Sequence, residues 1–397
     1  MSFKVSKGAN KLSIGLLAVG LVLLVIGIIT GMSHDGDHFG TRILTNLLSN
    51  SFYFFAVALG ALFFLALLYA TETGWYAVIK KMIEAVAGFL PWGMILLGGT
   101  LLVITLMDGA HIYVWMDQAV VDHDPIIEGK SFYLNKTFFW IRTVAYFAIY
   151  FLFLHGFKKR SRLEDEVGGT ELHFKNYKKG AGLLVFFAVF SSTSSWDWLM
   201  SIDVHWFSTL FGWYVFAGFW CATMVVLVLF ASYLKNNGYL TKINDSHIHD
   251  LGKWTFAISF LWSYLWFSQF MLYWYANIGE EVIYFQTRLH DHTFLYMGMF
   301  VINFILPMVL LMSREAKRNP GILAFVGLVI FFGHWVDFYL IISIAPMGKH
   351  LHMGALEIGM FLMFLGMFIM IILKNLSKGP IMPVNHPFLD ESLHHHI

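Results

Sequence analysis

Residues 191–218, SSTSSWDWLMSIDVHWFSTLFGWYVFAG, place polar chemistry between two long apolar segments. The uncharged residues on either side indicate two membrane spans, so the stretch is expected to form the sharp turn that joins them. Asp197, Asp203 and His205 then lie where the two spans meet. Ionisable side chains are costly at such positions unless they are paired or solvated, and two carboxylates beside a histidine favour a functional site.

Three tryptophans flank these ionisable groups: Trp196, Trp198 and Trp206. An indole has a large apolar body and one N–H donor, and it is enriched where lipid headgroups meet the hydrocarbon core. The alternative interpretation is therefore a loop that anchors the protein at the membrane surface. In the functional interpretation, Trp196 and Trp198 line a path for a ligand or for protons.

Composition assigns the rest of the chain to the membrane as well. Hydrophobic residues make up 58% of the chain and charged residues 13%, whereas a soluble domain has about 25% charged residues. We expect a single all-α integral membrane domain over residues 1–397. It is a polytopic helix bundle of about ten transmembrane helices, near residues 12–31, 51–71, 86–107, 138–157, 180–197, 207–234, 254–278, 293–313, 321–344 and 353–373.

Lys and Arg residues predict the orientation of this bundle. Most of them lie in the N-terminal segment and the even-numbered loops, above all between residues 158 and 179. Because cytoplasmic loops carry the excess of Lys and Arg, both termini are expected on the cytoplasmic side. The net charge of +1 offers no bulk attraction to nucleic acid, so no nucleic-acid partner is expected.

Cysteine and histidine usage limits the redox chemistry of the chain. The single Cys221 excludes a disulfide framework, a CxxC metal site and a CxxCH haem attachment within the chain. A two-haem cytochrome needs four histidines at matched depth on facing helices, and the expected spans hold almost none. The histidine spacings also indicate no metal site. We therefore expect no cofactor and no metal here, and redox centres in partner subunits.

With this orientation, most ionisable groups near the spans lie in the outer half of the membrane. His334 and Asp337 share a helix face, so they could hydrogen-bond or relay a proton; the alternative is a structural pair facing the interior. Glu357 lies one turn into the last span. Asp108 and His111 repeat the same spacing, but an exposed helix end is the simpler interpretation there.

A carboxylate pair, Glu280 and Glu281, is expected at the C-terminal end of the seventh span. The helix dipole disfavours negative charge at that end. A cation has to compensate, and Arg288 or Arg142 could do so.

Three sequence blocks resemble a known family. The first is DWLMS at residues 197–201, continued by HWFST at 205–209 and by Gly212; the others are WYANIGEEVIYF at 274–285 and HWVDFY at 334–339. The blocks, their spacing and the ten-span plan are similar to the polysulfide-reductase-like (NrfD-type) membrane subunits of alternative complex III. The resemblance covers most of the chain.

The resemblance implies a subunit of a respiratory quinol:cytochrome c oxidoreductase in the bacterial cytoplasmic membrane, not catalytic alone, that contributes to quinol oxidation and outer-side proton handling. It implies a pair of four-helix bundles with peripheral helices, and menaquinol or ubiquinol as ligand. The implied partners are a larger homologous NrfD-type subunit, an extracytoplasmic iron-sulfur subunit, multihaem c-type cytochrome subunits, membrane lipids and a terminal oxidase.

Quinol oxidation needs an apolar slot, groups that accept two protons and a nearby redox centre. This chain could supply the first two, with Asp197, His205, Asp337 and His334 as proton acceptors or relays. A turn between antiparallel spans would bring Asp197 and His205 together as an ion pair or a proton exit. The residues expected to line the quinone or proton path are Asp108, His111, Trp196, Trp198, Asp203, Glu280, Glu281 and Glu357.

Two alternatives remain open. One is a proton-translocating path without its own quinol site, through Asp337, His334 and Glu357. The other is a membrane scaffold that holds peripheral redox subunits through its outer loops.

Overall fold

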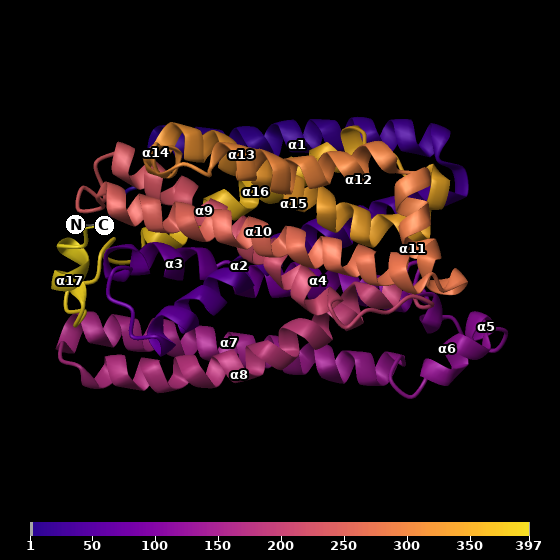
Figure 1. The fold of residues 1–397 in the computed structure, drawn as a ribbon, viewed down its shortest axis with the longest axis horizontal. Coiled ribbons are helices and arrows are strands. Elements are labelled where there is room, and N and C mark those ends of the chain that lie inside the picture. The colour runs from indigo at the N-terminus through magenta and orange to yellow at the C-terminus, as the bar shows by residue number, and fades with distance from the viewer. Residues whose placement is uncertain (1–2, 397) are drawn as a thin grey trace.

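The computed structural model describes residues 3–396 and consists of helices joined by short loops, with no strand in that part of the chain. The long helices run along the longest axis of the molecule (Figure 1). Both termini and α17 (Leu389–Leu393) lie at one end, which we call the terminal end. The short helices α5 (Gln118–Val121) and α6 (Pro125–Lys130) lie at the opposite end, which we call the far end. The all-α prediction is confirmed.

Within residues 3–396, nine helical segments are long and apolar enough to cross a membrane. They are α1 (Lys7–His34); Gly36–Ala70, which contains α2 (Phe39–Ala70); Ala77–Leu106, which contains α3 (Lys80–Ala87) and α4 (Leu90–Leu106); α7 (Lys136–Val167); Glu171–Ile202, which contains α8 (Glu171–Trp198); α9 (Phe211–Asn236); Thr293–Leu310, which contains α12 (Thr293–Phe300), a π-helical turn η5 (Val301–Ile305) and α13 (Leu306–Leu310); Pro320–His350, which contains α15 (Pro320–Met347); and α16 (Ala355–Leu376).

The seventh expected span, residues 254–278, lies in α10 (Asp245–Ala276), a helix of 32 residues that is not among the nine. Residues 261–276 of this helix, LWSYLWFSQFMLYWYA, are rich in Trp, Tyr and Ser, which lower its mean hydropathy. It packs along α9 and against α14 (Arg314–Arg318). A polytopic bundle is thus present, with nine apolar segments and one aromatic-rich helix.

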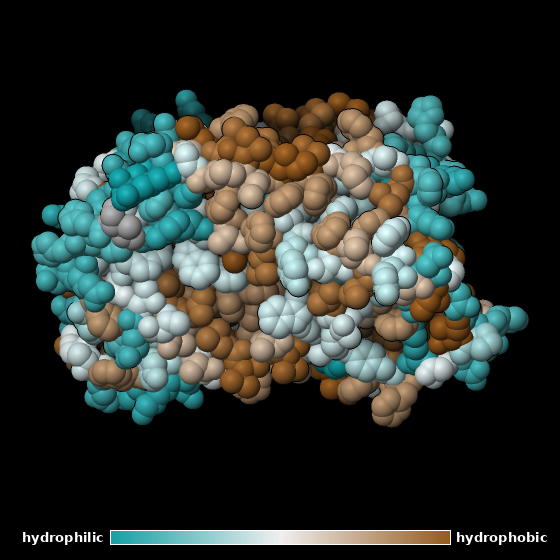
Figure 2. Space-filling view, in the orientation of Figure 1, coloured by the Kyte–Doolittle hydropathy of each residue, from teal (hydrophilic) through white to brown (hydrophobic). Residues whose placement is uncertain are grey.

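The surface has the pattern of a membrane-embedded bundle. Figure 2 shows hydrophilic residues at both ends and hydrophobic residues between them. Large apolar side chains such as Ile95, Val185 and Phe325 are more than half exposed on the sides of the bundle. Exposed apolar surface on this scale suits a lipid environment, in which helices satisfy their own backbone hydrogen bonds.

The centre of the bundle is α2, which packs against α4, α8, α9, α15 and α16. The consecutive aromatic residues Phe52, Tyr53, Phe54 and Phe55 are all buried, so the helix is covered around its whole circumference. A helix that is apolar on every side belongs in the core of a large bundle.

Helices α1 and α16 approach closely because glycines meet at their contact. A Cβ atom added at Gly359 would lie 2.5 Å from the backbone nitrogen of Leu24, and one at Gly20 would lie 2.7 Å from the carbonyl oxygen of Gly359. Small residues let backbones pack this tightly in lipid.

Candidate functional site

The break between α8 and α9 lies at the far end of the bundle, as the sequence predicts. Helix α8 ends at Trp198, a 3-10 turn follows at η4 (Met200–Ile202), and α9 begins at Phe211. The last carbonyls of α8 are satisfied by side chains: the Tyr113 hydroxyl donates to the Trp198 carbonyl at 2.7 Å, and the Ser201 hydroxyl donates to the Asp197 carbonyl at 2.6 Å. The break is therefore a well-bonded helix end.

Asp197 is fully buried in this break and is paired with Arg142 of α7. Arg142 Nε and Nη2 each donate to one carboxylate oxygen at 2.8 Å, and the Tyr146 hydroxyl donates to the carboxylate at 2.8 Å. The guanidinium also packs over the ring of Tyr133 at 3.9 Å. Three donors and a stacked cation make this a structural ion pair.

A cavity of about 380 Å³ opens beside this ion pair. Its walls are mostly apolar and aromatic, and they include Lys130, Tyr133, Trp196, Met200, Trp206 and Phe207. We call it the far-end cavity. Its volume lies in the range of small-molecule sites, which run from about 300 to 1,000 Å³.

Three buried polar atoms in the walls of the far-end cavity make no hydrogen bond of ordinary geometry: the Tyr133 hydroxyl and the indole nitrogens of Trp196 and Trp206. Burial first, and the negative charge of Asp197 next, raise the pKa of Tyr133, so its hydroxyl stays protonated and able to donate. Buried donors are normally satisfied in folded proteins, so three unsatisfied donors among the residues of one cavity are an unusual feature.

Asp203 and His205 lie in the loop between η4 and α9, beside the far-end cavity. Burial raises the pKa of Asp203, an effect that Arg288, His205 and Lys130 partly offset. His205 is exposed and its Nε2 lies 2.7 Å from the carboxylate of Asp124. That hydrogen bond lowers the pKa of Asp124.

The predicted contact between Asp197 and His205 is wrong. Asp197 points into the bundle, where Arg142 occupies both of its oxygens. His205 reaches outward to Asp124, the residue that caps α6. The two side chains therefore belong to different charge pairs.

A stack of three side chains connects the far-end cavity to the short helix α11 (Gly279–His290). The rings of Trp206 and Tyr284 are parallel, with centroids 3.8 Å apart and planes 8° apart. The Arg288 guanidinium lies over the Tyr284 ring, 3.2 Å from its centre. Tyr284 and Arg288 in turn line a second cavity.

The second cavity measures about 20 Å³ and is bounded by Asp337 of α15, with Gln269 and Arg288 among its other polar walls. Tyr214 of α9 donates to one Asp337 oxygen at 2.5 Å, and the Trp262 indole of α10 donates to the other at 3.1 Å. A volume of this size holds about one water molecule. It is too small for the ring of a quinol.

The predicted hydrogen bond between His334 and Asp337 is also wrong. The donors that reach Asp337 come from α9 and α10, and His334 is buried with no hydrogen-bond partner for either ring nitrogen. Its ring packs edge-on against Trp262, with centroids 5.3 Å apart. The i, i+3 spacing gives a common helix face, but the neighbouring helices decide the pairing.

One further buried amide lies next to His334. Asn303 belongs to the π-helical turn η5, and both polar atoms of its side chain are buried without a partner. The Asn303 oxygen contacts Gly333, where an added Cβ would collide with it. π-helical turns within helices frequently mark functional sites.

Glu357 and Trp198 are satisfied inside the bundle. Glu357 accepts two hydrogen bonds from Arg42, at 2.8 and 2.7 Å, and one from Asn46 at 3.0 Å. The indole of Trp198 donates to Thr143 at 3.1 Å, so Trp198 supports the helix end and does not line the far-end cavity. Trp196 does line it.

The remaining predicted residues lie away from both cavities. Asp108 and His111 are exposed and follow the end of α4 with positive φ values of 49° and 60°, so they share no helix face. Glu280 and Glu281 were expected at a helix C-terminus and instead occupy the first turn of α11, where the helix dipole favours carboxylates. The cause is Asn277, whose left-handed backbone ends α10.

Sequence reasoning missed the partners of the buried acids. Tyr214 and Trp262 lie in uniformly aromatic segments, so no local spacing connects them to Asp337. A signal did exist for Arg142, because an arginine inside an apolar span requires a buried partner. Comparison with protein-family models finds no match to this chain, and comparison with curated proteins finds no similar sequence.

Proposed function

We propose that this chain is a quinol-binding membrane subunit of a respiratory quinol-oxidising complex, of the NrfD type found in alternative complex III. The observation that carries the proposal is the far-end cavity, an aromatic slot whose lining residues Tyr133, Trp196 and Trp206 each have a buried polar atom without a partner. A quinol has a flat ring and two hydroxyl groups, so it matches an aromatic slot with a few polar atoms.

Oxidation of a quinol to a quinone releases two protons and two electrons. In our proposal, the Tyr133 hydroxyl and the two indoles orient the quinol oxygens. Asp203 takes the first proton, because burial raises its pKa and makes it a better base than an ordinary exposed carboxylate. The exposed pair of His205 and Asp124 passes protons to solvent.

The electrons leave to redox centres outside this chain. We propose iron-sulfur clusters and c-type haems in partner subunits as acceptors, with a larger homologous NrfD-type subunit beside this one in a bacterial cytoplasmic membrane. The cavity is lined in part by Lys130 at the end of α6, and α6 lies at the far end of the bundle (Figure 1), a location that suits acceptors bound at the membrane surface. Asp197 then serves as a positioning residue, since it holds Arg142 against Tyr133.

Photo-crosslinking tests the proposal directly. A photoreactive quinone analogue is added to the purified complex in its native membrane, and labelled peptides are identified by mass spectrometry. We expect labels within residues 129–134 and 196–207, and competition by excess quinol. Labels found only on another subunit would contradict a quinol site in this chain. Labelling of this chain that stays equally strong in excess quinol would contradict it too.

A second function is favoured by a separate observation. His334, which lies one helical turn before Asp337, and Asn303, which contacts Gly333, are both buried without partners. Internal water molecules are normally found beside such groups, and a chain of waters and polar groups conducts protons. We therefore also propose that Asp337 and His334 belong to a proton path, which operates whether or not the quinol binds in this chain.

A further inference from the structure

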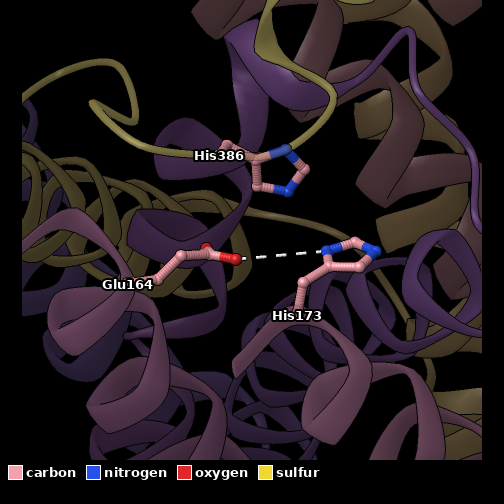
Figure 3. A group of neighbouring side chains, drawn as sticks. All are labelled: Glu164, His173 and His386. Atoms are coloured by element: carbon pink, nitrogen blue, oxygen red, sulfur yellow. Dashed lines mark ion pairs between the residues drawn. The ribbon is translucent and has the colours of Figure 1, made fainter. Parts of the chain in front are cut away.

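Three buried side chains meet at the terminal end of the bundle, far from the cavities described above. Glu164 lies near the end of α7, His173 lies in the first turn of α8, and His386 lies in the C-terminal segment between α16 and α17. Their exposed fractions are 0%, 2% and 4%. Figure 3 shows all three directed toward a common point.

The potential ligand atoms of these residues lie close together. One from each residue, a carboxylate oxygen or an imidazole nitrogen, lies within 4.8 Å of the other two. Glu164 Oε1 and Nδ1 of His173 are 4.0 Å apart (Figure 3). The Glu164 oxygen, both nitrogens of His173 and Nε2 of His386 are buried without a hydrogen-bond partner.

We propose that Glu164, His173 and His386 form a binding site for a divalent transition-metal ion of the Zn²⁺ type. Two imidazoles and one carboxylate are a ligand set of zinc sites in which the fourth position is held by water. Zinc bonds of about 2.0–2.2 Å in tetrahedral geometry hold two ligand atoms roughly 3.4 Å apart. Closing the separations, which are at most 4.8 Å, to that value takes side-chain movements of up to about 1.4 Å.

The hydrogen bonding of His386 agrees with a ligand role, because its Nε2 is buried without a partner. Its Nδ1 accepts a hydrogen bond from the backbone N–H of Phe388 at 3.2 Å. A metal bond through Nε2 places a proton on Nδ1, so metal binding should break this hydrogen bond and shift the segment around Phe388.

Lys80 is the competing cation. Its ammonium group donates to Glu164 Oε2 at 2.5 Å and leaves the other oxygen, Oε1, for the ion. The neighbouring Lys81 is itself paired with Asp165 at 2.6 Å and lies 3.7 Å from Glu84. Because both lysines have carboxylate partners, part of their repulsion of the ion is offset.

The bound ion would join the C-terminal segment to the α7–α8 hairpin. Two hydrogen bonds already attach that segment: Val384 N–H donates to the Asp165 carboxylate at 3.0 Å, and the Asn385 amide donates to the Asp165 carbonyl at 2.9 Å. A metal bond to His386 adds a stronger link at the same place. The site is therefore a clamp that depends on metal for its full stability.

The test measures zinc in the full-length chain, purified in detergent, stripped with chelator and equilibrated with Zn²⁺. The exposed His394 and His396 are first changed to Gln, since exposed histidines bind zinc adventitiously. We expect one zinc per chain, and X-ray absorption should show two nitrogen ligands at about 2.0–2.1 Å. His173→Gln and His386→Gln should each remove this zinc.

His249→Gln is the matched control. His249 is also buried, at 6%, and its Nδ1 also lacks a partner, but it belongs to no such group. This variant should keep one zinc per chain. Lys80→Met should raise the zinc affinity by about tenfold or more, because it removes the adjacent positive charge.

Several outcomes overturn the proposal. These are the absence of bound zinc in the parent chain, equal zinc contents in the parent and both histidine variants, and an absorption spectrum without imidazole ligands. The spectrum is recorded on the parent chain, so it decides the question even if a variant fails to fold.

Discussion

Trp206 and Tyr284 stack in parallel with ring centroids 3.8 Å apart, and this contact joins the loop between α8 and α9 to helix α11. Trp206 forms a wall of the far-end cavity, and Tyr284 forms a wall of the small cavity at Asp337. The two candidate sites therefore share one rigid element. A ligand that moves Trp206 would move Tyr284 and Arg288 with it.

The strength of this stack is measurable by a double-mutant cycle with Trp206→Leu and Tyr284→Leu. Parallel aromatic pairs contribute about 0.5–1.5 kcal/mol beyond their buried area. We expect a coupling energy of that size in the free energy of unfolding, measured by denaturant titration in detergent. Strictly additive effects would show that the two rings are only neighbours.

The Asp197→Asn variant should lose stability. The amide leaves the Arg142 guanidinium without a charge partner in a nearly dry site, and breaking a buried ion pair in this way costs about 3–5 kcal/mol. Thermal unfolding and the yield of assembled complex report the loss. Asp108→Asn is the control, because the exposed pair of Asp108 and Lys136 contributes only about 0–1 kcal/mol. An unfolding midpoint equal to that of the parent chain would contradict the structural role of Asp197.

Asp203 should give turnover a dependence on pH. Burial raises the pKa of Asp203, so the folded chain keeps this proton to a higher pH than the unfolded chain does. Its favourable contribution to stability is complete below the ordinary value near 3.8 and is lost as pH rises through the raised pKa. Turnover follows the opposite course, since only the ionised carboxylate accepts a proton.

The Asp203→Asn variant separates these two effects. At neutral pH it should be more stable than the parent chain, because the buried ionised carboxylate is gone, and this difference should vanish in acid. Its turnover should fall and should lose the rise with pH assigned to Asp203. A pH–rate profile and unfolding curves across the same range provide both measurements. A variant with the parental profile would remove Asp203 from the proton route.

The sequence was sufficient for the coarse architecture. Long uncharged runs predict membrane helices because lipid requires apolar surface and internally bonded backbone, and nine of the expected spans have helices that meet this requirement. The break at Asp197 was also predictable, since charged residues interrupt the apolar pattern there. The helix end at Asn277 was not, because the aromatic run gives no sign of a left-handed residue.

The pairing of buried charges required the structure. Asp337 has partners in α9 and α10, and Glu357 has its partner Arg42 in α2, so each contact joins segments far apart in sequence. The i, i+3 spacing predicted a hydrogen bond between His334 and Asp337. Spacing along one helix carries no information about which other helices become its neighbours. The group of Glu164 with two histidines was hidden for the same reason.

Tyr133→Phe should weaken quinol binding with little change in fold. The substitution removes one hydroxyl from the far-end cavity and keeps the ring that packs on Arg142. One hydrogen bond contributes about 0.5–1.5 kcal/mol, so the KM for quinol should rise roughly 2- to 12-fold. Tyr239→Phe is the control, because its hydroxyl bonds to the Lys4 carbonyl and does not line the far-end cavity. An unchanged KM would indicate that the quinol oxygens do not reach Tyr133.

Asp337→Asn tests the proton path. The amide oxygen can accept from Tyr214, but its NH₂ group then faces the Trp262 indole N–H, so one buried donor loses its acceptor. The free energy of unfolding should fall by about 1–3 kcal/mol. If Asp337 carries protons, the complex in liposomes should release fewer protons per electron while quinol oxidation continues.

Ser343→Ala is the matched control for that experiment. Ser343 is buried in the same helix as Asp337. Its hydroxyl lacks a partner, as the His334 ring does, and it does not line the cavity at Asp337. Its loss should leave the proton yield unchanged. His334→Gln should lower the yield as Asp337→Asn does, since both residues belong to the proposed path. If both variants keep the parental yield, protons do not pass through this part of the chain, and the polar groups around Asp337 serve to hold α9, α10 and α15 together.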